Sequence, residues 1–150
     1  MSISDFQTYS EFVYSLQERY ESIQHSTLVL ATIGSTLAKL EGQIIFEGNI
    51  VLDIWELVDY AVGRIRNYSY EIYLASEKIA WYDPFEHPHV AELASTYPHH
   101  KHISTNIKHH RVPAPGISFE QPNLHTLIEE IQREILPSSP PPFGQSLPCR

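Results

Sequence analysis

The chain has 150 residues and is poor in cysteine, in basic residues and in long hydrophobic runs. Its one cysteine, Cys149, excludes an internal disulfide and a cysteine-based zinc site, so nothing argues for an oxidising compartment. The longest apolar runs, such as 28–31, are far shorter than the roughly 20 residues that cross a bilayer. The N-terminus lacks the basic and apolar regions of a secretory signal. These absences predict a soluble, cytoplasmic protein with no membrane contact.

The scarcity of basic residues is uneven along the chain. Lysine and arginine number 10 against 18 acidic residues, so the net charge is −8, unlike the basic balance of most nucleic-acid binders. Residues 1–83 hold 12 acids and 5 bases, a net charge of −7, and residues 119–150 carry −2. Residues 84–118 carry +1 before any histidine is counted. This middle segment is therefore the part of the chain that suits a phosphodiester ligand.

Hydrophobic spacing predicts an α+β fold with one antiparallel sheet. Residues 4–24 place apolar side chains on one helical stripe, and residues 121–136 do the same for a second helix. Turns between the intervening strands are too short for parallel crossovers, which predicts a meander of about four or five strands. The predicted strands are 27–33, 36–46, 50–60, 64–74 and 78–82.

These elements make one predicted domain at 1–136, followed by a proline-rich tail at 137–150 that we expect to be disordered. Within the domain, the periodicity fails at 83–119, where prolines break any long element and indicate a long loop. Seven of the nine histidines lie in a 24-residue window of this loop: His87, His89, His99, His100, His102, His109 and His110.

The densest element of this loop is the run from Tyr97 to His102, Tyr-Pro-His-His-Lys-His. In an extended conformation His100 and His102 point to one face, and His99 with Lys101 to the other. The candidate catalytic residues are His99, His100, Lys101 and His102, with Tyr82 and Asp83 from the end of the preceding strand. The candidate phosphate contacts are Arg64, Arg66, Lys108 and Arg111.

Three chemistries fit this histidine cluster. In metal-independent RNA cleavage, one imidazole removes the 2′-hydroxyl proton, another protonates the leaving oxygen, and a cation stabilises the charge on phosphorus. In a metal site, neutral His-x-His pairs supply nitrogens to zinc or a similar ion. In a non-enzymatic protein, the histidines are structural or simply polar surface. The residues alone leave these alternatives open.

The order of these features resembles the TumE-like toxins of prokaryotic type II toxin–antitoxin systems, over about residues 5–136. A leading helix is followed by a meander with the turn Glu47–Asn49, by Tyr68–Tyr70, by Trp81–Asp83, and by the histidine element 97–102. A C-terminal helix then closes the chain. Tyr82 and Asp83 match a Tyr-Asp pair of the family pattern, whereas Trp81 stands where the pattern has arginine and Pro84 where it has asparagine.

The resemblance implies a small cytoplasmic toxin encoded beside a cognate antitoxin, often one with a helix-turn-helix DNA-binding domain. RNA cleavage is the activity expected from other small toxins, with RNA as substrate and no cofactor. The alternative is a non-enzymatic protein-binding or metal-binding module. A homodimer and the identity of any bound metal are left open.

Overall fold

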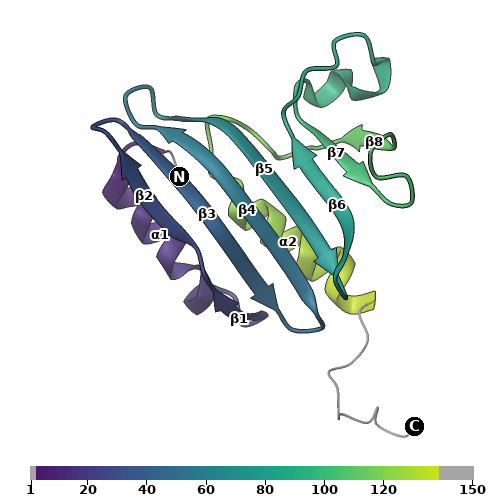
Figure 1. Ribbon diagram of the computed structural model, residues 1–150, viewed down its shortest axis with the longest axis horizontal. Coiled ribbons are helices and arrows are strands. Elements are labelled where there is room, and N and C mark those ends of the chain that lie inside the picture. The colour runs from purple at the N-terminus through teal and green to yellow at the C-terminus, as the bar shows by residue number, and fades with distance from the viewer. Residues whose placement is uncertain (1–2, 139–150) are drawn as a thin grey trace, which may run out of the picture.

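The structure is a computed structural model that describes residues 3–138, in which one antiparallel sheet has two helices on one face (Figure 1). Each neighbouring pair of strands is antiparallel, and β2 and β1 pair with different parts of β3. The strands are β1 (Ile23–Ser26), β2 (Val29–Ile33), β3 (Leu37–Phe46), β4 (Ile50–Asp59), β5 (Arg64–Leu74), β6 (Glu77–Asp83), β7 (His100–Ile103) and β8 (Arg111–Pro113). The helices are α1 (Phe6–Arg19) and α2 (Leu124–Glu130).

The predicted α+β class with an N-terminal and a C-terminal helix is confirmed, but the predicted number of strands was wrong, because the sheet has eight. The first helix ends at Arg19, with Tyr20 as its C-cap, so Ile23 begins β1 instead of extending the helical stripe. The region without periodicity contributes β7 and β8, which are too short to show an alternating pattern. Backbone pairing holds both in the sheet, β7 along the edge of β6 and β8 along β7.

Short helical turns complete the chain. A 3₁₀ helix, η1 (Ala91–Thr96), precedes β7, and α2 continues into a π-helical turn, η2 (Ile131–Ile135), and a 3₁₀ turn, η3 (Leu136–Ser138). The predicted tail from residue 139 onward lies outside the described residues. No helix within residues 3–138 is long and apolar enough to span a membrane.

The core lies between the sheet and the two helices, and it contains the fully buried carboxylate of Glu56. Along β4, the inward positions Ile50, Leu52 and Ile54 are apolar, and Glu56 continues the same series. Its carboxylate accepts hydrogen bonds from the Tyr9 hydroxyl of α1 and from the Tyr70 hydroxyl of β5 (2.5 Å). Burial raises the pKa of Glu56 to about 7, although both hydroxyls lower it.

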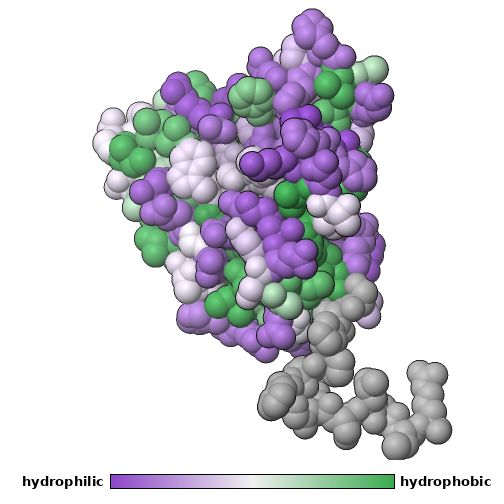
Figure 2. Space-filling model, turned by 45° about the vertical axis from the view of Figure 1, so that its right-hand side comes forward, coloured by the Kyte–Doolittle hydropathy of each residue, from purple (hydrophilic) through white to green (hydrophobic). Residues whose placement is uncertain are grey.

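The other face of β3 to β6 lies in front in Figure 1, where no described helix covers it. This open face is continuous with β7 and β8, which extend the sheet beyond β6. Hydrophilic side chains gather over this end of the molecule, around η1, β7 and β8 (Figure 2). The histidine-rich segment therefore forms one end of an open sheet face.

Candidate functional site

Pairing between β6 and β7 brings the histidine element to the end of the sheet. Asp83 pairs with His100, and Trp81 pairs with His102. Because side chains alternate along a strand and paired residues share a face, these four side chains lie on the open face. Tyr82 and Lys101 pair with each other and lie on the helix-covered face.

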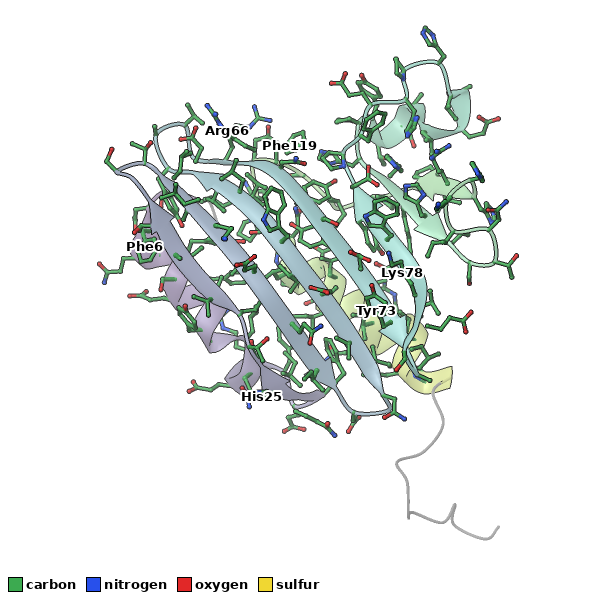
Figure 3. The ribbon with its side chains drawn as sticks, viewed as in Figure 1. Phe6, His25, Arg66, Tyr73, Lys78 and Phe119 are labelled. Atoms are coloured by element: carbon green, nitrogen blue, oxygen red, sulfur yellow. The ribbon has the colours of Figure 1, made fainter. Side chains whose placement is uncertain are left out.

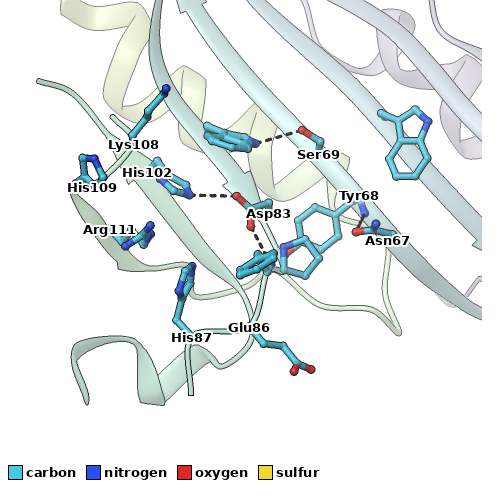
Figure 4. Close-up of a pocket in the computed structure, with 14 residues that line it drawn as sticks. Asn67, Tyr68, Ser69, Asp83, Glu86, His87, His102, Lys108, His109 and Arg111 are labelled. Carbon is cyan, nitrogen blue, oxygen red and sulfur yellow. Dashed lines mark hydrogen bonds and ion pairs between the residues drawn. The ribbon is translucent and has the colours of Figure 1, made fainter. Parts of the chain in front are cut away.

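Asp83, His100 and His102 form a compact cluster (Figure 4). The His100 Nε2 atom lies 3.3 Å from Asp83 Oδ1, and the His102 Nε2 atom lies 3.1 Å from Asp83 Oδ2. The two Nε2 atoms are 3.1 Å apart. Both imidazoles are buried, and the His102 ring stacks on Trp81 with centroids 4.5 Å apart. Two imidazoles and one carboxylate therefore converge on a single point.

The outer nitrogens of the two rings fix which nitrogen carries a proton. The His100 Nδ1–H donates to the Pro98 carbonyl (3.1 Å), and the His102 Nδ1–H donates to the Ile107 carbonyl (2.7 Å). A neutral imidazole with its proton on Nδ1 has only a lone pair on Nε2. In the neutral state, two lone pairs and a carboxylate would therefore face one another at hydrogen-bond distance. One shared proton, or one bound cation, would remove the electrostatic repulsion among these three groups.

Burial sets the protonation of His100. It lowers the pKa of His100 below the ordinary histidine value, and the Pro98 hydrogen bond and the Asp83 charge only partly oppose it. The neighbouring His87, whose ring centroid lies 5.0 Å from that of His100, also has a lowered pKa through burial and the nearby Arg111 charge. A neutral His100 with an acceptor at Nε2 suits a general base near pH 7.

The cluster opens into a cleft of about 1020 Å³ on the open face. Asp83 and His102 line it, and the wall from β7 to β8 adds Lys108, His109 and Arg111. Neither Lys108 nor Arg111 forms an ion pair with an acid of residues 3–138. These two cations are therefore available to an anionic ligand.

Lys101 and Tyr82 lie away from this cleft, on the face covered by α2. The Lys101 ammonium is 2.5 Å from the Glu130 carboxylate, and the Tyr82 hydroxyl donates to the same carboxylate. The Lys101 ammonium also lies 5.3 Å from the centre of the Tyr82 ring. These contacts attach α2 to the sheet, which indicates a structural role for both residues.

Replacing Lys101 with methionine tests that structural role. The change leaves a largely buried Glu130 without its cation, so we expect a loss of roughly 2 kcal/mol of stability, less than for a fully buried pair. Denaturant unfolding measures this loss. Lys39→Met is the matched control because its ion pair with Glu41 is exposed, and it should change stability little. Unchanged stability of the Lys101→Met variant would contradict this structural role.

Three other predicted residues are also separate from the cluster. The His99 ring lies between Tyr68 and Phe119, and its Nδ1 is 2.6 Å from the Tyr68 hydroxyl. Burial lowers the pKa of His99. Arg64 lies over the Phe119 ring, and Arg66 forms an ion pair with Asp59 (2.8 Å). Arg66 lies at the upper end of the sheet, away from β7 and β8 (Figure 3).

Sequence reasoning missed several cleft residues, foremost Trp55 and Ser69, which lie on neighbouring strands. The alternation of β4 already placed Trp55 on the face opposite to the apolar series Ile50, Leu52 and Ile54. A tryptophan on the face opposite to the apolar series is an available signal. No local pattern predicts that β6 pairs with β7. This pairing brings β4, β5 and β6 beside the histidine element.

These features define a small α+β protein with a histidine–aspartate cluster at the end of an open sheet face. The family model described as Toxin TumE matches residues 13–135, more than half of the chain. The chain therefore belongs to the TumE toxin family, which confirms the resemblance drawn from its motifs. It is a toxin component, and its family implies an antitoxin as partner. No curated protein and no solved structure matches the chain.

Proposed function

We propose that this toxin is an endoribonuclease in which Asp83, His100 and His102 form the proton-transfer centre. The observation that carries the proposal is the convergence of the two Nε2 atoms, 3.1 Å apart, on one carboxylate at the wall of a cleft. Asp83 orients the rings and stabilises the imidazolium that forms when either ring takes up a proton. Lys108 and Arg111 are suited to bind the phosphate whose charge grows during the reaction.

The reaction involves two proton transfers. The neutral Nε2 accepts the 2′-hydroxyl proton, and O2′ forms a bond to phosphorus. The bond from phosphorus to O5′ then breaks, its electron pair stays on O5′, and O5′ takes up a proton. The attacking and leaving oxygens lie on opposite sides of phosphorus, whereas the two Nε2 atoms are close neighbours. We therefore assign the cluster to the first transfer and assign the second to another cleft residue, His87, Lys108 or His109.

Incubation of purified protein with an RNA oligonucleotide in EDTA tests this function. We expect cleavage of the RNA but not of a DNA oligonucleotide of the same sequence, because DNA lacks the attacking hydroxyl. Mass spectrometry should find 2′,3′-cyclic phosphate and 5′-hydroxyl ends. Absence of cleavage, or equal cleavage of DNA, would contradict the proposal. Growth after induction in cells is followed in parallel, because toxicity by itself does not identify the reaction.

A second candidate function is metal binding by the same three side chains. Metal-bound histidines usually donate the other ring N–H to a carbonyl, as His100 and His102 do here. Ligands bound to zinc at about 2.0–2.1 Å in a tetrahedral arrangement lie roughly 3.3 Å from one another, close to the spacing of this cluster. Zinc analysis of untagged protein tests this alternative. Cleavage that EDTA abolishes and zinc restores would favour it over the metal-free reaction.

A further inference from the structure

The two tryptophans of the chain flank the same strand on the open face of the sheet. Trp55 of β4 pairs with Ser69 of β5, and the Trp81 Nε1–H of β6 donates to the Ser69 hydroxyl (3.2 Å). All three residues line the cleft beside the Asp83–His100–His102 cluster. Both indoles are partly exposed, so each retains surface for a ligand. A small hydroxyl side chain therefore lies between two large aromatic ones.

The strand spacing leaves room for one aromatic ring between the positions of the two tryptophans. Adjacent strands lie about 4.8 Å apart, so side chains on β4 and β6 project from backbones separated by roughly 10 Å. The Trp81 ring already stacks on His102 and directs its Nε1–H edge to Ser69. A base that stacks on Trp55 above the short Ser69 side chain would therefore meet Trp81 at its edge. We propose that Trp55 and Trp81 form a stacking subsite for one nucleobase of a single-stranded RNA.

The surrounding charge favours a nucleic acid over an apolar ligand. Lys108 and Arg111 line the same cleft, and the segment 99–111 that carries them contains no acid. Asp83 and Glu86 are the carboxylates of the cleft, and Asp83 is engaged by the two histidines. A basic wall beside exposed aromatic rings is the usual design for holding single strands. This subsite rests on the proposed RNA cleavage, because it would hold the base next to the scissile phosphate.

Tryptophan fluorescence measures the subsite directly, because the chain has two tryptophans and both line the cleft. The ligand is a 2′-O-methyl oligouridylate, which has bases and phosphates but cannot be cut by attack of a 2′-hydroxyl. We expect it to quench the emission on binding. An abasic strand of the same length and charge should bind at least fivefold more weakly and leave the emission unchanged. Equal binding of the two strands with no quenching would overturn the subsite.

Variants separate stacking from a general loss of structure. Trp55→Ala should weaken oligouridylate binding at least fivefold, whereas Tyr73→Ala should not. Tyr73 is an aromatic residue of β5 that lines a different pocket, lower on the sheet (Figure 3). Ser69→Phe keeps both tryptophans but fills the space between them, so it should abolish the quenching. Binding at wild-type strength by Trp55→Ala and Ser69→Phe would contradict the proposal.

These measurements distinguish failure of the subsite from failure of the proposed cleavage. Quenching by the uncleavable strand without cleavage of ordinary RNA would support the subsite and remove the proposed function. Cleavage without quenching would support the proposed function and contradict the subsite.

Discussion

His100→Ala and His102→Ala should each slow RNA cleavage by about 100-fold to 10,000-fold, the usual contribution of a positioned acid or base. Each change removes one of the two Nε2 atoms that converge on Asp83. Because the two imidazoles act as one unit, the double variant should be at most about tenfold slower than the slower single variant. Rates are measured on the RNA oligonucleotide at saturating concentration.

His89→Ala is the matched control, since His89 is an exposed histidine of the same segment and does not line the cleft. It should cleave at the wild-type rate. His100 and His102 are buried, so circular dichroism must show that their variants remain folded at the assay temperature. Asp83→Asn keeps the shape of the side chain but removes the charge and replaces one acceptor oxygen with an NH2 donor. Both imidazoles remain, so its loss should be smaller than that of either histidine variant. Folded histidine variants that cleave at the wild-type rate would exclude the cluster from the chemistry.

The sequence predicted part of this site because strands alternate with a period of two. The run His99–His102, once extended, places His100 and His102 on one face and Lys101 on the other, as the structure does. The same rule separates Tyr82 from Asp83, which are adjacent in β6, so the two cannot face one cleft. Applied to β6, the alternation would have assigned Tyr82 to the helix-covered face.

Other parts of the site depend on pairing between distant segments. His100 meets Asp83 only through the register of β6 and β7, which a long proline-rich segment separates in sequence. The region after β6 shows no clear periodicity, because β7 and β8 are short and are held by backbone hydrogen bonds, β7 to β6 and β8 to β7. Backbone pairing of this kind leaves no mark on side-chain pattern, which is why the number of strands was underestimated.

Glu56 provides the second large expected effect, on stability instead of cleavage. Its pKa is raised to about 7 in the folded protein, against an ordinary value of 4.5, because its carboxylate is buried in the core. The fold therefore favours the protonated carboxyl. The contribution of protonated Glu56 to the free energy of unfolding is fully present below about pH 4.5 and is lost as the pH rises through 7. A shift of this size corresponds to roughly 3 kcal/mol between those limits, at about 1.36 kcal/mol for each pH unit.

Glu56→Gln should remove this pH dependence. A neutral amide resembles the protonated carboxyl, so it can keep hydrogen bonds to Tyr9 and Tyr70 without the cost of a buried charge. Urea unfolding should find the variant and the wild type within about 1 kcal/mol of each other at pH 5. At pH 8 the variant should be more stable by roughly 3 kcal/mol.

Glu47→Gln is the control for the loss of one negative charge, because Glu47 is exposed in the turn between β3 and β4. The stability of Glu47→Gln should depend on pH in the same way as that of the wild type. The Tyr70 hydroxyl also accepts a hydrogen bond from the Asn123 side chain (3.0 Å), so the Glu56 network joins α1, the sheet and the start of α2. Ionisation of Glu56 should therefore weaken the attachment of both helices together, in one cooperative transition. A Glu56→Gln variant whose stability falls between pH 5 and pH 8 as steeply as that of the wild type would show that Glu56 stays ionised in the core.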